Sequence, residues 1–195
     1  MATDALNAVS DAEIIASSLN DPEAFAALFD SYHAMLYRYV SFRLGPEVAE
    51  DLVNEAFLIA FRRRRSYDLS YRDARPWLLG IATKLIARYR RAEVSRYRAL
   101  ERQHPLQRVE GPEEAITHDL IAAGARPALL HALSLLSRGD RDVLLLVAWS
   151  DMTYDEAARA LDIPLGTVKS RLNRARRKVR DALGDVNPLK EDSDG

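Results

Sequence analysis

The sequence predicts an all-α protein of two small helical domains joined by a flexible linker, the C-terminal domain being a helix-turn-helix. Apolar residues recur at spacings of three and four along most of the 195-residue chain, which is the period of helices that bury one face. No stretch alternates apolar and polar residues as a strand does. With 48% hydrophobic residues, the chain has enough apolar surface to build a core in each domain.

The first domain is expected to contain three long helices. Asp21 and Pro22 are typical of a helix start, an N-cap followed by proline at the first helical position, and this helix should end at Gly45. Pro46 starts the second helix and Pro76 the third, on either side of a polar turn. In the first helix, the expected inward stripe is Phe25, Leu28, Phe29, Tyr32, Leu36, Tyr39 and Val40.

The stretch between the two domains is rich in proline and glycine and shows little periodicity, which indicates a linker. Beyond it, short helices are expected from Pro127 to Leu136 and, with Ser137 as its cap, from Arg138 to Trp149. The predicted order is a first domain at 1–103, a linker at 104–125, a helix-turn-helix domain at 126–183 and an acidic tail at 184–195.

The segment from Thr153 to Leu183 has the pattern of a helix-turn-helix. Thr153 and Glu156 match a capping box, residues 162–166 break the helix, and a basic helix follows. An ordinary helical hairpin with a solvated basic face is the alternative, but a helix of this kind fits the major groove. The DNA-facing candidates are Thr167, Lys169, Ser170, Arg171, Asn173, Arg174, Arg176 and Arg177, with Lys169, Ser170 and Arg174 nearest the base edges.

Charge is segregated along the chain, although the whole carries only −1. Residues 62–102 hold 13 basic and 4 acidic residues, and residues 164–183 hold 7 and 1, whereas the segments around them are acidic. Solvated helix faces usually mix both signs, so two separate basic blocks are better interpreted as two phosphate-facing surfaces.

Four segments resemble extracytoplasmic-function (ECF) sigma factors of the sigma-70 family. Leu161–Leu172 (LDIPLGTVKSRL), followed by Arg174 and Arg176, is similar to region 4, and Asp21–Leu28 is similar to the start of region 2. Ala49–Phe57 resembles the segment that docks on RNA polymerase, and Pro76–Lys84 resembles the helix behind promoter melting. The resemblance covers about three quarters of the chain and implies a sigma factor with regions 2 and 4.

The resemblance implies that the first domain docks on the clamp helices of the largest subunit of core RNA polymerase. Leu52 and Phe57 have an alternative role as core residues, because only some residues of this helix can point outward. Asn54 stands where the family commonly has glutamine. The implied polymerase-binding residues are Asp51, Leu52, Asn54, Glu55 and Phe57.

The resemblance also implies that the same domain opens the minus-10 element. Unstacked bases are held by aromatic and polar pockets and by cations that follow the strand. Lys84 stands where the family commonly has asparagine, which leaves the minus-10 preference open. Tyr89 either stacks on a base or packs in the core. The implied minus-10 residues are Tyr67, Tyr71, Arg72, Arg75, Lys84, Arg88 and Arg91.

No catalytic function is expected. The four histidines are scattered, the chain has no cysteine, and neither a metal-ligand pattern nor a glycine-rich phosphate loop is present. We therefore expect no metal and no cofactor. No run of apolar residues approaches the length of a membrane span, so no membrane insertion is expected. The resemblance implies a location in the bacterial cytoplasm. The expected partners are core RNA polymerase, promoter DNA as duplex and single strand, and an anti-sigma factor.

Two other functions remain open from the sequence. A stand-alone helix-turn-helix regulator would use its first half to sense or dimerise and would bind duplex DNA without polymerase. A sigma-like protein that docks on polymerase without supporting transcription is the second alternative.

Overall fold

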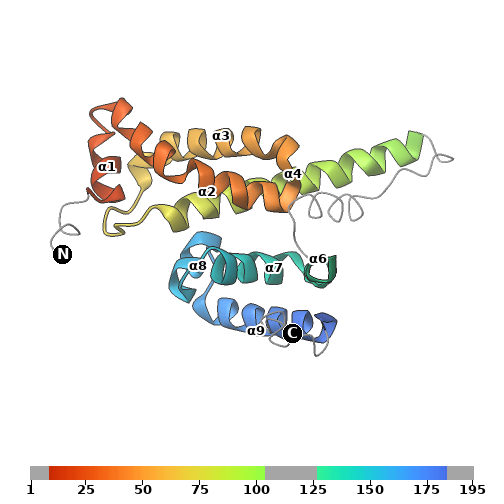
Figure 1. Cartoon of the computed structure of the whole chain (residues 1–195). Helices are drawn as coiled ribbons and strands as arrows, with labels where there is room; N and C mark the ends of the chain where they lie inside the picture. The colour runs from red at the N-terminus through yellow and green to blue at the C-terminus, as the bar shows by residue number, and fades with distance from the viewer. Residues whose placement is uncertain (1–8, 104–126, 184–195) are drawn as a thin grey trace, which may run out of the picture. The chain divides into compact units, whose positions relative to one another are not determined.

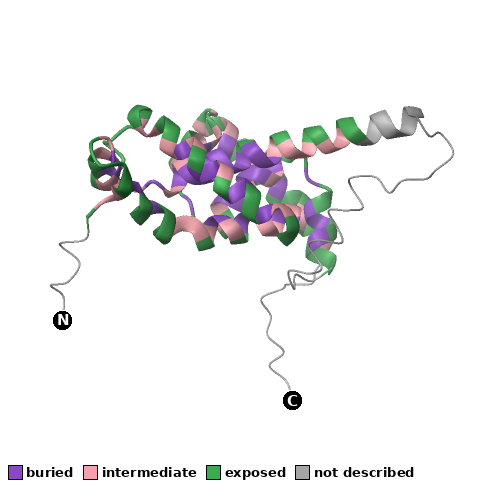
Figure 2. Cartoon of the chain, turned by 90° about the horizontal axis from the view of Figure 1, so that it is seen from above, coloured by how far each residue is buried: buried purple, intermediate pink, exposed green. Residues whose placement is uncertain are grey.

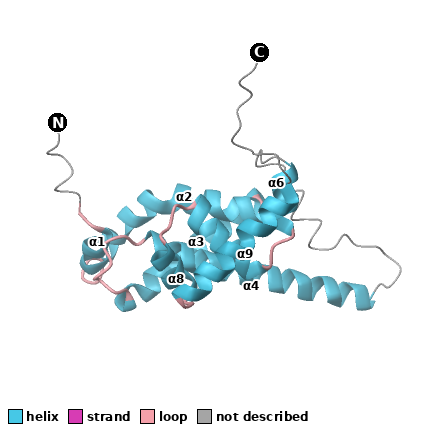
Figure 3. Cartoon of the chain, turned by 90° about the horizontal axis from the view of Figure 1, so that it is seen from below, coloured by secondary structure: helices cyan, strands magenta, loops and turns pink. Residues whose placement is uncertain are grey.

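The computed structural model describes residues 9–103 and 127–183, with side chains up to Arg96 in the first segment. The chain divides into two compact units between Arg91 and Ala92, and each is considered by itself. Every regular element in the described segments is a helix (Figure 3), so the predicted fold class is confirmed.

The N-terminal unit contains two long helices packed against each other and a third that continues beyond it (Figure 1). Gly45 separates the first two at φ 86°, a backbone conformation that side chains with a Cβ rarely adopt, so the helices turn sharply there. The expected helix end at Gly45 and start at Pro46 are confirmed. The elements are α1 (Asp11–Ser17), η2 (Pro22–Phe25), α2 (Ala26–Leu44), α3 (Pro46–Arg63), η3 (Arg64–Ser66) and α4 (Arg75–Gln103).

Helix α1 was not expected from the sequence, although a local signal for it exists. Ser10 and Glu13 form a capping box in which the Ser10 hydroxyl accepts from the Glu13 N–H and the Glu13 carboxylate accepts from the Ser10 N–H. The next helix start was expected at Asp21 and Pro22. The Asp21 carboxylate accepts from the Glu23 N–H at 3.2 Å, and a 3₁₀ turn precedes α2.

The core of this unit is formed by buried residues of α2, α3 and α4; Figure 2 colours buried residues purple. Within it, the Tyr39 and Thr83 hydroxyls are hydrogen-bonded at 2.8 Å. The expected stripe of α2 is mostly correct, but Phe29 is 37% exposed and Tyr32 is half-buried. The largest fully buried side chains of the unit are Ile15, Leu28, Leu36, Tyr39, Val40, Val53, Leu78, Leu79 and Ile86.

The C-terminal unit is built from short helices around the long basic helix. Ser137 caps α7 as expected, its hydroxyl accepting from the Asp140 N–H at 3.3 Å. The helix expected to run to Trp149 changes at Leu145 to a π-helical turn. The elements are α6 (Pro127–Ser134), α7 (Arg138–Leu144), η4 (Leu145–Trp149), α8 (Tyr154–Leu161) and α9 (Leu165–Leu183).

Helices α8 and α9 form the predicted helix-turn-helix. The capping box of α8 is present, and Asp162 ends the helix in the left-handed conformation. Helix α9 begins at Leu165, one residue before the Gly166 at which the break was expected to end, and the Pro164 carbonyl accepts from its first turn. The buried residues of the two helices are Ala157, Ala160, Val168, Leu172 and Ala175.

Two expected segments, the linker at 104–125 and the acidic tail at 184–195, lie outside the described residues. Among the helices that are described, none has the length and apolar character needed to cross a membrane.

The turn between α8 and α9 offers a test of local strain. Asp162 has φ 55°, and glycine adopts this conformation without steric cost, so Asp162→Gly should stabilise the C-terminal unit by about 0.5–1 kcal/mol. Urea unfolding of the full-length chain measures this, with Trp77→Phe as background so that Trp149 is the only tryptophan reporter. Asp162→Val should destabilise the unit, and equal stabilities of the two variants would contradict the strain.

Candidate nucleic-acid and polymerase interfaces

The outer face of α9 carries the residues predicted to meet duplex DNA. Thr167 and Arg171 are half-buried, and the other predicted residues are exposed. The Ser170 hydroxyl donates to the Thr167 carbonyl at 3.1 Å, which holds this side chain against the first turn. The exposed residues along this face are Lys169, Ser170, Asn173, Arg174, Arg176, Arg177 and Lys178.

Two arginines of α9 lie against the start of α7, which sequence reasoning missed. The Arg174 Nε lies 3.3 Å from the Asp140 carboxylate, whose side chain is only 4% exposed. The Arg171 guanidinium lies over Gly139, where a Cβ would come within 2.8 Å of its Nη1. Arg174 is therefore an ion-pair partner within the chain as well as a DNA candidate, and Gly139 leaves the space that Arg171 occupies.

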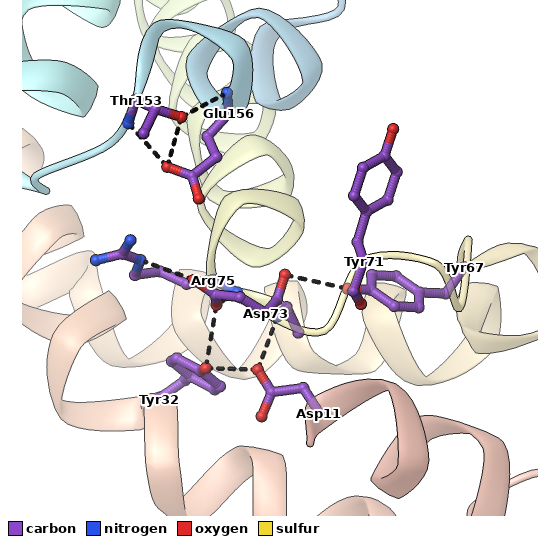
Figure 4. Close-up of polar contacts among 9 residues, drawn as sticks. Asp11, Tyr32, Tyr67, Tyr71, Asp73, Arg75, Thr153 and Glu156 are labelled. Atoms are coloured by element: carbon purple, nitrogen blue, oxygen red, sulfur yellow. Dashed lines mark hydrogen bonds and ion pairs between the residues drawn. The ribbon is translucent and has the colours of Figure 1, made fainter.

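The two predicted tyrosines of the loop after α3 point in different directions, and only the Tyr67 hydroxyl lies against the backbone of the loop (Figure 4). The Tyr67 hydroxyl lies 2.8 Å from the Tyr71 carbonyl and 3.1 Å from the Asp73 carbonyl, and its ring packs on Trp77. Tyr71 is 39% exposed, Arg72 is exposed, and Arg75 is half-buried with its Nε 3.5 Å from the Asp73 carboxylate. Tyr67 thus shapes the loop, whereas Tyr71 and Arg72 face outward.

The three predicted cations of α4 share one exposed face. Lys84, Arg88 and Arg91 are four and three residues apart and are all exposed. Arg88 forms an ion pair with Glu55 of α3, so a predicted DNA contact and a predicted polymerase contact touch each other. Tyr89 is half-buried.

The arginines at the end of α3 and in η3 extend the positive surface. Arg62, Arg63 and Arg65 are exposed. Arg64 instead turns inward, with its guanidinium 3.7 Å from the centre of the Phe61 ring and bonded to the Phe61 and Ser18 carbonyls. Three of the four arginines are therefore available to a polyanion.

Helix α3 presents only part of the predicted polymerase-binding set. Asp51 and Asn54 are exposed and Glu55 is half-exposed. Leu52 and Phe57 belong to the core, the alternative that the sequence left open, and the Phe57 ring centre lies 4.8 Å from that of Phe29. Sequence reasoning missed Leu58, which is 47% exposed and lies one turn after Asn54 on the same face.

The comparisons with known proteins match the chain in two separate segments. Residues 28–96 match the family model for sigma-70 region 2, and residues 126–179 match that for sigma-70 region 4. The ECF RNA polymerase sigma factor SigW of Bacillus subtilis is 30% identical over 180 residues, covering 85% of this chain and 92% of SigW. The chain belongs to the sigma-70 family, as an ECF RNA polymerase sigma factor.

Solved structures share the fold at lower sequence identity. CnrH, in complex with the cytosolic domain of CnrY, aligns at a TM-score of 0.63 and 22% identity, covering 89% of this chain and 96% of that one. The sigma factor RpoE of Bartonella quintana, in complex with the anti-sigma factor NepR, aligns at 0.60 and 21% identity, covering 86% and 98%.

The Asp140–Arg174 ion pair predicts different costs for two substitutions on α9. Arg174→Ala leaves a nearly buried carboxylate unpaired and should destabilise the C-terminal unit by about 1–2 kcal/mol, whereas Lys169→Ala should change its stability by less than about 0.5 kcal/mol. Urea unfolding with Trp149 as reporter compares them. Adding Asp140→Asn to Arg174→Ala should restore part of the loss, and additive losses in the double variant would contradict the pairing.

Proposed function

We propose that this ECF sigma factor binds core RNA polymerase in the bacterial cytoplasm and directs promoter-specific transcription initiation. The C-terminal unit reads the minus-35 duplex through α9, and the N-terminal unit opens and holds the minus-10 element through the loop after α3 and the face of α4. We assign these roles to residues 126–183 and 1–103, with 104–125 as the connection between them. The protein initiates transcription through binding and has no catalytic activity of its own.

The observation that carries the proposal is the presence of two different basic surfaces on separate units. The face of α9 has the shape and charge that suit a major groove. The other surface combines exposed Tyr71 with Arg72 and the cations of α4, which suits an unstacked single strand. A stand-alone regulator needs the first kind of surface but has no use for the second.

Polymerase docking is assigned to the acidic outer face of α3. Asp51, Asn54 and Glu55 lie on it, and exposed Leu58 adds an apolar contact. Leu52 and Phe57 support this face from the core rather than touching the partner. The acidic face suits a basic partner surface, and the family resemblance points to the clamp helices of the largest subunit.

An anti-sigma factor is the third proposed partner. CnrH and RpoE, which share the fold, were solved as complexes with CnrY and the anti-sigma factor NepR. We infer that this chain is likewise held by such a protein when it is not bound to polymerase.

Run-off transcription with purified core RNA polymerase and a promoter library tests the function as a whole. We expect transcripts that need both the core enzyme and this chain, from promoters that share two sequence elements. Absence of transcripts from every library member would refute the proposal. Specific duplex binding by the chain alone would favour the stand-alone regulator.

A charge reversal tests the docking face. Asp51→Arg places a cation on the acidic face of α3 and should weaken binding to core polymerase by about tenfold, measured by competition with a labelled sigma factor. Asp181→Arg changes the net charge equally on exposed α9 of the other unit and should leave core affinity unchanged. Equal affinities of the two variants for core polymerase would show that α3 does not bind it.

A substitution at Gly166 should change DNA binding and folding stability in opposite directions. It lies in the first turn of α9, and an added Cβ would meet nothing within 4 Å, so Gly166→Ala should stabilise the free protein by about 0.5 kcal/mol. The same methyl group would crowd the DNA at the end of the helix that approaches it most closely. We expect lower transcription from minus-35-dependent promoters despite higher stability. Unchanged transcription would mean that DNA does not approach this end of α9.

A further inference from the structure

Helix α1 is joined to the end of the loop after α3 by a cluster of two carboxylates and a phenol, which is drawn in Figure 4. One oxygen of the Asp11 carboxylate accepts from the Tyr32 hydroxyl at 2.6 Å and from the Ala74 N–H at 2.7 Å. The Asp11 N–H in turn donates to the Arg72 carbonyl at 3.1 Å. A single residue of α1 therefore binds the loop on both sides of Asp73.

Asp73 completes the cluster and connects it to α4. Its carboxylate lies 3.3 Å from the Tyr32 hydroxyl and accepts from the Arg75 N–H at 2.8 Å, at the first residue of the helix. Burial and the hydrogen bond to Asp11 raise the pKa of Tyr32, so its hydroxyl keeps its proton at physiological pH. Asp11, Tyr32 and Asp73, which we call the loop clamp, thus join α1, α2 and the start of α4.

The remainder of the loop is closed on itself. Tyr67 bonds back to the carbonyls of Tyr71 and Asp73, and its ring is held by Trp77. Asp68 accepts from the Ser70 N–H at 3.0 Å, and the Tyr71 N–H donates to the Asp68 carbonyl at 3.1 Å. The loop is therefore fixed at its base and turned tightly at its tip.

We propose that the loop clamp is a positioning device for promoter opening: it holds Tyr71 and Arg72 in the arrangement that receives an unstacked base of the minus-10 strand. The inference rests on the proposed function, which assigns this loop to that strand. Asp11 lies outside the segment that matches region 2, so it adds a residue of α1 to the opening machinery. A loop already in its bound conformation loses less conformational entropy on binding.

Asp11 and Tyr32 are partly buried, so losing them also lowers stability, and the test must separate the two effects. Tyr32→Phe removes the clamp hydroxyl. Tyr39→Phe is the matched control, because it makes the same change in the same helix and removes a buried hydroxyl that bonds Thr83 and Arg43 but is remote from the loop contacts. Asp11→Ala is the second clamp variant, with Ile15→Val as a core control in α1.

The probe is a single-stranded oligonucleotide with the non-template minus-10 sequence of a promoter that this protein transcribes, bound to reconstituted holoenzyme and followed by fluorescence anisotropy. Tyr32→Phe and Asp11→Ala should weaken oligonucleotide binding roughly five- to tenfold with unchanged core affinity. Tyr39→Phe and Ile15→Val should bind like the wild type, even where their melting temperatures fall as far.

The outcomes distinguish this inference from the proposed function. Wild-type affinity in both clamp variants, or equal losses in clamp and control variants, overturns the clamp while promoter opening by the protein stands. If wild-type holoenzyme shows no preference for the minus-10 sequence in the oligonucleotide, both the loop clamp and the proposed function are overturned. Amide hydrogen exchange of the free protein provides a second measurement: residues 68–74 should exchange at least about tenfold faster in Tyr32→Phe than in Tyr39→Phe, and equal rates overturn the clamp.

Discussion

The packing of α2, α3 and α4 around one core determines what the N-terminal unit can present to its partners. Because α3 buries Leu52, Val53 and Phe57, the acidic side chains on its other face have to point outward. The long α4 is fixed by the same core, so its cations form one row and the loop before it begins and ends at defined positions. The proposed docking face and the proposed strand-holding surface are therefore both set by one packing arrangement, and they meet at the Glu55–Arg88 ion pair.

Both units use groups within the chain to hold residues that we assign to DNA. In the C-terminal unit the nearly buried Asp140 holds Arg174, and in the N-terminal unit Asp11 and Tyr32 hold the end of the loop. Because the side chain or loop is already ordered, less conformational entropy is lost when the partner binds. They also mean that a substitution at Arg174 changes stability and DNA contact together, so activity has to be compared with folding.

Local signals in the sequence predicted most of the fold, and contacts between distant helices account for most of what it missed. Gly45, Pro46 and the Thr153–Glu156 capping box each act within one turn and were identified correctly, and the same kind of signal at Ser10 and Glu13 was overlooked. Helix periodicity leaves the outward direction uncertain by a residue or two, which is why the sequence pointed to the buried Phe57 and missed the exposed Leu58. The Asp140–Arg174 and Asp11–Ala74 contacts join residues more than thirty positions apart and have no local signature.

The ion pair between Glu55 and Arg88 has a consequence for how the two partners influence each other. It links a residue assigned to polymerase with one assigned to DNA, so a partner that engages Glu55 changes the free energy with which Arg88 meets a phosphate. Both side chains are substantially exposed, which limits this coupling to about 1 kcal/mol or less. By reciprocity, promoter DNA that binds Arg88 changes the free energy of binding to polymerase by the same small amount. Added salt weakens the coupling in both directions.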